Sequence, residues 1–317
     1  MQNFTSFSDV DDLPKLLKTA ENYRQNPLRD RTLGDGKTLG LFFFNASLRT
    51  RLSTQRAARN LGLEVMIMNF GSEGWQLEFT DGTVMDAGKA EHVREAAGVI
   101  SQYCDLVGIR TFAGLTDREE DYAETILTAF KRHLRVPLVS LESATRHPLQ
   151  SLADVLTIRR FQPVERPVVT LTWAPHPRAL PQAVANSFLE WMRGWGEVKL
   201  RLACPPGLEL APEFRGDVPV FHDQAAAFEG AHFVYAKNWS SYVDYGTIAT
   251  EHADWMVNAA KMSLTDHGKF MHCLPVRRNV VVADAVLDGP DSLVLEQADQ
   301  RTWAAQAVLA QILSHEI

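Results

Sequence analysis

The sequence predicts an α/β protein with two doubly wound domains, each built around a parallel sheet. Three observations carry this prediction. Between residues 37 and 141, short apolar runs alternate with helical patterns, which is the order of parallel βαβ units. The same alternation starts again at Pro167 and ends at Leu274. A chain of 317 residues is also long enough for about two domains that each bury a core.

The first domain, assigned to residues 1–146, is predicted to contain strands joined by helices. The apolar runs that indicate strands lie near residues 37–44, 63–69, 105–110 and 136–141. The helical patterns between them lie near residues 49–61, 90–103 and 118–133. Helical connections favour parallel pairing, because a parallel connection must cross the face of the sheet.

The second domain, assigned to residues 147–296, is predicted to start with a helix near residues 144–155. Its strands are expected at Pro167–Trp173, Val198–Ala203, Val218–Phe221, His232–Tyr235 and Phe270–Leu274. Helices are expected between them, notably at 181–193 and 222–229. The last helical stretch lies within residues 297–317 and is long enough to cross back and pack on the first domain.

The composition limits the classes of function. The 32 basic and 39 acidic residues give a net charge of −7, which disfavours nucleic-acid binding. Cys104, Cys204 and Cys273 are widely spaced and form no zinc-ligand pattern, which indicates a reducing compartment and no structural metal. No apolar run reaches the length of about 18 residues that a membrane span requires. We therefore expect a cytoplasmic protein without a membrane or nucleic-acid partner.

One motif directly follows the first predicted strand, where the chain would enter a helix. It reads Ser47-Leu48-Arg49-Thr50-Arg51 and supplies a hydroxyl, two guanidinium groups and a run of backbone N–H groups. Helix N-termini attract anions, and arginines add charge-assisted bonds to phosphate. The motif predicts a phosphate site; the alternative is a helix start with two solvated arginines.

A second motif, Arg146-His147-Pro148-Leu149-Gln150, follows the predicted strand at 136–141. Open α/β sheets bind ligands at the carboxyl ends of their strands. His147 could donate a hydrogen bond to a carbonyl oxygen, and Gln150 could accept one from an amide, so the pair suits a planar carbamoyl group. The alternative is an ordinary turn, but the phosphate site upstream favours a ligand.

Two common nucleotide motifs are not supported by the sequence. Gly36-Lys37-Thr38 imitates the end of a Walker A loop, but Arg31 stands where that motif needs its first glycine. No G-x-G-x-x-G sequence follows any predicted strand, which argues against a dinucleotide-binding enzyme.

The chain resembles the aspartate/ornithine carbamoyltransferase family over nearly its whole length. The resemblance is carried by three ordered motifs, which are Ser47–Arg51, His147-Pro-x-Gln150 and His272-Cys-Leu-Pro275. Arg110, at the end of the third strand, and Arg301, in the last helix, also fit the family pattern. The resemblance implies carbamoyl transfer from carbamoyl phosphate with no cofactor and no metal.

The resemblance also implies a role for each motif. The phosphate would be held by Ser47, Leu48, Arg49 and Thr50, and the carbamoyl group by Arg110, His147 and Gln150. Cys273 and Leu274 would line the place where the two substrates meet, and Arg301 would close over it. Among these, Thr50, Arg110, His147 and Cys273 would act in catalysis, the first three by stabilising the oxyanion. Trp75 would reach into a neighbouring subunit of a trimer; alternatively, it folds onto its own domain.

The acceptor is expected to be an N-acylated ornithine. Ordinary ornithine carbamoyltransferases carry an aspartate after the fourth strand of the second domain, whereas this chain has Lys237. A lysine repels a free α-amine and attracts a carboxylate. The resemblance maps the acceptor site to Glu142, His176, Lys237 and Arg277. The alternative for Glu142 and His176 is a hydrogen-bonded structural role, and for Lys237 it is a solvated strand end.

Two acyl groups compete, succinyl and acetyl. Acetylornithine enzymes have a glutamate where this chain has Ala90, and a lysine where it has Val281 or Val282. A missing carboxylate at position 90 removes a like charge that would oppose succinate, so succinylornithine is favoured. A shift of one residue would instead put Glu91 in that role. Acetylornithine, then ornithine and aspartate, and a catalytically silent binding protein remain the alternatives.

Overall fold

The computed structural model describes residues 1–315, so the last two residues of the predicted C-terminal stretch, 316 and 317, lie outside it. The chain divides into two compact units. The first unit contains residues 1–114, 119–149 and the segment from Arg301 onward. The second contains residues 115–118 and 150–300.

The first unit is built on a four-stranded parallel sheet with the order β2-β1-β5-β6. The strands are β1 (Thr38–Phe43), β2 (Glu64–Asn69), β5 (Leu106–Arg110) and β6 (Leu138–Glu142). Each lies within two residues of its predicted bounds, and the side chains of β1, β5 and β6 are largely buried in the core. The edge strand β2 is only partly buried.

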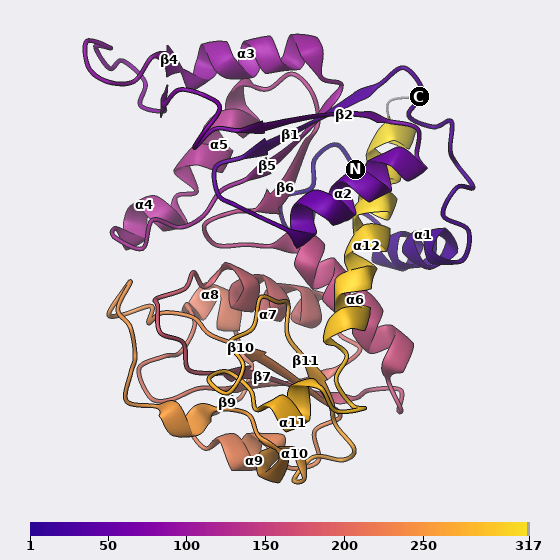
Figure 1. The fold of residues 1–317 in the computed structure, drawn as a ribbon, viewed down its shortest axis with the longest axis vertical. Helices are drawn as coiled ribbons and strands as arrows, with labels where there is room; N and C mark the ends of the chain where they lie inside the picture. The colour runs from indigo at the N-terminus through magenta and orange to yellow at the C-terminus, as the bar shows by residue number, and fades with distance from the viewer. Residues whose placement is uncertain (316–317) are drawn as a thin grey trace. The chain divides into compact units, whose positions relative to one another are not determined.

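Helices cover both faces of this sheet (Figure 1). On one face, α3 (Val93–Tyr103) and α5 (Thr125–His133) enclose a core of aliphatic and aromatic side chains from β1, β5 and β6. The other face carries α2 (Arg49–Asn60) and α12 (Val294–His315), and α1 (Leu13–Gln25) lies beside α12. The amide of Asn60 on α2 donates to Gln306 Oε1 on α12 at 2.9 Å. The predicted return of the last helix to the first domain is confirmed.

Two predicted helices of the first unit are wrong in detail. The stretch 118–133 is divided into α4 (Arg118–Tyr122) and α5, because Glu124 has a left-handed φ of 52°. The stretch 90–103 starts as a helix only at Val93, because β4 (Glu91–His92) pairs with β3 (Leu77–Glu78). Both breaks depend on contacts distant in the sequence, which helical periodicity does not report.

The second unit is built on a five-stranded parallel sheet with the order β11-β10-β7-β8-β9. The strands are β7 (Val168–Trp173), β8 (Lys199–Ala203), β9 (Val220–Phe221), β10 (Phe233–Lys237) and β11 (Lys269–Met271). The helices are α6 (Pro148–Phe161), α7 (Ala183–Trp195), α8 (Pro212–Arg215), α9 (Gln224–Phe228), α10 (Ala259–Met262) and α11 (Asp284–Leu287). Of these, α6 begins in the first unit.

The strand expected at Phe270–Leu274 is wrong at its C-terminal end, since β11 stops at Met271. Leu274 has a φ of 57° and its peptide bond to Pro275 is cis, so the backbone turns away from the extended form. Within this turn, the Leu274 N–H donates to His272 Nδ1 at 2.9 Å. No helix within residues 1–315 has both the length and the apolar character of a membrane span.

Candidate functional site

The first motif lies where the sequence places it, between β1 and α2. Helix α2 begins at Arg49, and its N-cap residue, Leu48, makes no side-chain capping bond. The N–H groups of the first helical turn have no partner inside a helix, so they can bind an anion. Ser47 is half-buried and Leu48 is 66% exposed, whereas Thr50 is buried.

Arg110 ends β5, the strand that pairs with β1, and it is held on three sides. Its Nη2 atom donates to Glu142 Oε2 at the end of β6 at 2.9 Å. Its Nη1 atom donates to the carbonyl oxygen of Asn45 at 3.0 Å and to that of Ala46. The guanidinium also lies 4.2 Å from the ring centre of Phe112. These contacts hold the positive charge of Arg110 against the loop that leads to α2.

Arg301 joins two of the predicted site residues. Its Nη2 atom donates to Thr50 Oγ1 at 2.8 Å, and its Nη1 atom lies 3.3 Å from His147 Nε2. All three side chains are buried. The structure therefore brings Thr50, Arg110, Glu142, His147 and Arg301 together at the carboxyl edge of the first sheet.

His147 is neutral in this cluster. Burial holds its pKa well below the usual range, and the charges of Arg301, Arg110 and Arg49 lower the pKa further. The Arg301 guanidinium can only donate, so Nε2 of His147 accepts and Nδ1 carries the proton. Nδ1 is buried and has no hydrogen-bond partner within residues 1–315. The approach of Nε2 to Glu142 Oε2 at 3.5 Å is consequently not an ion pair.

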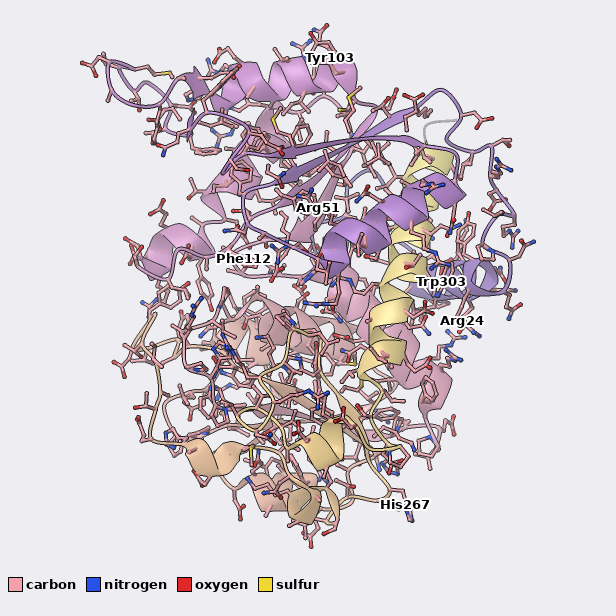
Figure 2. The ribbon with its side chains drawn as sticks, viewed as in Figure 1. Arg24, Arg51, Tyr103, Phe112, His267 and Trp303 are labelled. Atoms are coloured by element: carbon pink, nitrogen blue, oxygen red, sulfur yellow. The ribbon has the colours of Figure 1, made fainter. Side chains whose placement is uncertain are left out.

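Arg51, the second arginine of the first motif, is engaged outside this cluster. Its Nη2 atom donates to Asn69 Oδ1 at the end of β2, and its guanidinium lies 4.6 Å from the ring centre of Phe43. Figure 2 labels Arg51 on α2. In this structure the Arg51 side chain contacts the ends of β1 and β2, so its charge lies at the edge of the sheet.

In the second unit, Gln150 lies in the first turn of α6. Its Nε2 atom donates to Asp154 Oδ1 at 2.8 Å, and both side chains are buried. The same Oδ1 atom accepts from Gln297 Nε2 at 2.7 Å. The Oε1 atom of Gln297 accepts from the backbone N–H of His272 at 2.9 Å, which holds the turn that contains Cys273 and Leu274.

Sequence reasoning missed Asp154 and Gln297. One signal was present, because Asp154 follows Gln150 by four residues and therefore lies on the same helix face. A carboxyl group on a helix that is otherwise apolar in this region needs a polar partner. Gln297 had no such signal, since its partners are distant in the chain.

Three predicted acceptor-site residues lie in the second unit. Lys237 ends β10, is only 8% exposed, and donates from Nζ to the carbonyl oxygen of Asn238 at 2.9 Å. Burial lowers the pKa of His176. A hydrogen bond with the backbone of Arg178 raises this pKa, and the charges of Lys237, Arg277 and Arg178 lower it. The fourth predicted residue, Glu142, belongs to the first unit and pairs with Arg110.

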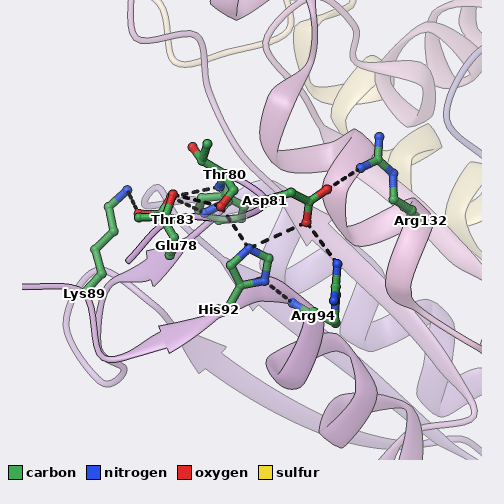
Figure 3. Close-up of polar contacts among 9 residues, drawn as sticks. Glu78, Thr80, Asp81, Thr83, Lys89, His92, Arg94 and Arg132 are labelled. Carbon is green, nitrogen blue, oxygen red and sulfur yellow. Dashed lines mark hydrogen bonds and ion pairs between the residues drawn. The ribbon is translucent and has the colours of Figure 1, made fainter. Parts of the chain in front are cut away.

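The segment that carries Ala90 is held by two acidic side chains (Figure 3). Glu78 accepts from the N–H groups of Phe79 and Thr80, both at 2.8 Å, and lies 3.1 Å from Lys89 Nζ. The hydrogen bond from the Thr80 N–H and then that from Lys89 lower the pKa of Glu78 to about 2.

The second of these acidic side chains, Asp81, lies within ion-pair distance of Arg94 at 3.2 Å and of Arg132 at 3.0 Å. Arg94 lies on α3 and Arg132 on α5, so the two ion pairs connect the segment to these helices. Ala90 itself is exposed, and its N–H donates to the carbonyl oxygen of Gln76 at 3.2 Å.

Trp75 lies on the same segment and is 59% exposed. Its indole N–H donates to Glu91 Oε2 at 2.8 Å, so the carboxylate next to Ala90 is held by the tryptophan. Trp75 also lines an apolar groove of about 330 Å³ with Met66, Met68 and Tyr103. No group of three or more metal-ligating side chains occurs within the described part of the chain.

The fold and this cluster define a class of two-domain α/β transferases, and comparison with known proteins identifies the family. Residues 2–160 match the model of the aspartate/ornithine carbamoyltransferase carbamoyl-P binding domain. Residues 181–312 match the model of the Asp/Orn binding domain of the same enzymes. The chain belongs to the aspartate/ornithine carbamoyltransferase family.

Three members of this family are similar to the chain over nearly its full length. The chain is 47% identical to N-succinylornithine carbamoyltransferase of Bacteroides thetaiotaomicron over 99% of both chains. It is 34% identical to N-acetylornithine carbamoyltransferase of Xanthomonas axonopodis pv. citri, over 96% of this chain and 93% of the relative. A solved glutamate-to-alanine variant of N-acetyl-L-ornithine transcarbamylase, complexed with carbamyl phosphate and N-succinyl-L-norvaline, has a TM-score of 0.92. It is 34% identical and covers 98% of this chain and all of its own.

Proposed function

We propose that this protein transfers the carbamoyl group of carbamoyl phosphate to the side-chain amine of N-succinyl-L-ornithine in arginine biosynthesis. The products are N-succinyl-L-citrulline and phosphate. The 47% identity to a succinylornithine enzyme over the full length carries this proposal, since the acetylornithine enzyme is only 34% identical.

The cluster in the first unit suits the donor half of this reaction. The amine attacks the carbonyl carbon, the bond from that carbon to the phosphate oxygen breaks, and a phosphate oxygen takes the amine proton. The protonated Nδ1 atom of His147, together with Arg110 and Thr50, stabilises the charge that grows on the carbonyl oxygen. Ser47, Leu48 and Arg49 bind the departing phosphate through the start of α2.

The second unit offers positive charge to the acceptor. The pKa of His176 is lowered in part by Lys237 and Arg277, so these two cations act on the same region. A carboxylate of the acylornithine would satisfy them, whereas a free ammonium would be repelled. Cys273 and Leu274, in the turn after β11, would line the place where amine and carbamoyl group meet.

The succinyl group is favoured over acetyl by the residue at position 90. The small, exposed Ala90 leaves room where acetylornithine enzymes carry a carboxylate. Variants of such an enzyme in which a glutamate is replaced by alanine, proline, valine or serine have been solved as complexes with N-succinyl-L-norvaline. The neighbouring Glu91 is held by the Trp75 indole, whose N–H donates to its Oε2 atom at 2.8 Å, and this contact supports assigning the missing carboxylate to position 90.

A homotrimer with shared sites is part of the proposal. The groove beside the edge strand β2 is apolar, and its Met66, Trp75 and Tyr103 side chains are 51%, 59% and 68% exposed. Figure 2 labels Tyr103 at the end of α3. Such a surface suits a second copy of the chain. Sedimentation equilibrium should give three times the monomer mass, and a monomer with full activity would overturn this part.

One assay tests the function. Carbamoyl transfer to succinylornithine, acetylornithine, ornithine and aspartate is measured side by side as kcat/KM. We expect succinylornithine to exceed the others by at least about tenfold, which corresponds to about 1.4 kcal/mol of transition-state binding. A preference for acetylornithine would correct the acyl group only. Turnover with none of the four would overturn the enzymatic proposal. The cytoplasmic location expected from the sequence stays a prediction.

A further inference from the structure

A buried carboxyl group in the second unit connects two parts of the site. Asp154 on α6 is fully buried, and its Oδ1 atom accepts from Gln150 Nε2 at 2.8 Å and from Gln297 Nε2 at 2.7 Å. Gln297 is also fully buried. One oxygen atom thus accepts hydrogen bonds from the NH₂ groups of two glutamines. One of them lies near the start of the unit's sequence and the other near its end.

The chemistry of these groups determines which way each amide points. A glutamine side chain presents NH₂ donors on one side and a carbonyl oxygen on the other. Because Oδ1 of Asp154 accepts, both amides turn their NH₂ groups toward it and their oxygens away from it. For Gln297 the result is visible, since its Oε1 accepts from the backbone N–H of His272 at 2.9 Å.

The same logic applies to Gln150. With its NH₂ directed at Asp154, its Oε1 atom faces the opposite side of the amide. An oxygen in that place accepts hydrogen bonds, and the NH₂ of a carbamoyl group donates them. A reversed amide would present NH₂ to NH₂ and lose the interaction.

We propose that Asp154 is a positioning residue that orients Gln150 to recognise the NH₂ group of carbamoyl phosphate and orients Gln297 to hold the turn at His272. This inference rests on the proposed function, in which Gln150 contacts the carbamoyl group. It adds a specificity to that function: the protein distinguishes a carbamoyl from an acetyl group on the same phosphate. Acetyl phosphate carries a methyl group in place of NH₂, so it cannot donate to Gln150.

Binding of three anions to the full-length protein tests the inference by isothermal titration calorimetry. The ligands are carbamoyl phosphate, acetyl phosphate and inorganic phosphate. Wild type should bind carbamoyl phosphate about tenfold more tightly than acetyl phosphate, the effect of one well-made hydrogen bond. Asp154→Leu, which removes the acceptor at similar size, should reduce this ratio to below about threefold. Affinity for inorganic phosphate should not change, because the cradle in the first unit is intact.

Two further variants separate positioning from a general loss of structure. Asp154→Asn keeps an oxygen that can accept from Gln150, so it should restore part of the discrimination. Thr157→Val is the matched control, because Thr157 is also fully buried on α6 and its hydroxyl donates only along the helix, to the carbonyl oxygen of Ala153 at 2.7 Å. This control should keep the full ratio.

The outcomes are distinct. Undiminished discrimination in Asp154→Leu overturns the positioning role while leaving the proposed function in place. Absence of discrimination in wild type overturns both the role of Gln150 and the inference. Should Asp154→Leu not fold, Asp154→Asn is compared in wild type and in Gln150→Ala. The inference requires that it lower the ratio only where Gln150 is present, and equal effects in both backgrounds contradict it.

Discussion

Replacement of Arg301 by leucine should disable the site through His147. The guanidinium donates to Thr50 Oγ1 at 2.8 Å and to His147 Nε2 at 3.3 Å. Without it, the neutral imidazole is no longer held as the tautomer with its proton on Nδ1. A misplaced donor to an oxyanion typically costs about 3–4 kcal/mol, so kcat/KM should fall by about two to three orders of magnitude.

The same change should alter the pH dependence in a predictable direction. Burial is the main cause of the low pKa of His147, and the charge of Arg301 is the next. Removing that charge raises the pKa of His147 relative to wild type, while burial still holds it below its usual range. As the pH falls, the residual activity of Arg301→Leu should therefore decline at a higher pH than the activity of wild type does.

The control for this prediction is Arg56→Leu. Arg56 is also an arginine near α12, with its guanidinium 5.7 Å from the ring centre of Trp303, and within residues 1–315 this is its only recorded side-chain contact. Its loss should change kcat/KM by less than about threefold. If Arg301→Leu shows the same small loss and an unchanged pH profile, the tautomer argument is refuted.

Three other changes test separate parts of the structure. Glu124→Ala removes the carboxylate that accepts from the N–H groups of Ala144 and Thr145 at 3.1 and 2.8 Å. It should lower the free energy of unfolding, measured by urea titration, by about 2–3 kcal/mol, and an unchanged midpoint would contradict this expectation. Ala90→Glu should shift the kcat/KM ratio from succinylornithine toward acetylornithine by about tenfold or more, and a constant ratio would remove the charge argument. Gly62→Ala places a methyl group 2.2 Å from the carbonyl oxygen of Arg31 at a φ of 84°, so calorimetry should show a clearly lower Tm, whereas a higher Tm would mean that the turn is not required.

The arrangement of residues at the proposed phosphate site could be predicted from the sequence because it depends on local order. Apolar runs located β1, β5 and β6 to within two residues, and Arg110, His147 and the start of α2 lie at the end of these runs or within a short loop after them. Parallel strands bring their carboxyl ends to one edge, so Arg110 and His147 had to lie near the start of α2. This conclusion needs only the position where each strand ends. It does not need the register in which neighbouring strands pair.

The rest of the site depends on contacts that no local pattern reports. Arg301 reaches Thr50 across 251 residues of chain, and only the family resemblance indicated it. The break at Glu124 is set by the backbone of residues 143–145, which its carboxylate holds. Gln297 meets Asp154 across 143 residues. In each case the partner is chosen by tertiary packing, which periodicity and propensity do not contain.

The electrostatics of the cluster explain why a chain with a net charge of −7 can still bind a phosphorylated donor. Arg110 and Arg301 are 7% and 3% exposed, and Glu142 is the buried carboxylate beside them. His147 adds no positive charge of its own, because burial first, and then the charges of those same arginines, hold its pKa well below the usual range. Two buried guanidiniums and one carboxylate leave a surplus of positive charge, to which Arg49 at the start of α2 contributes.

Buried charge is costly without a counter-charge, so an anionic ligand lowers the free energy of the folded protein. The departing phosphate, whose charge increases as its bond to the carbamoyl carbon breaks, gains most from that surplus. In the proposed reaction, the charges of Arg49, Arg110 and Arg301 therefore serve both to bind the donor and to favour the transition state.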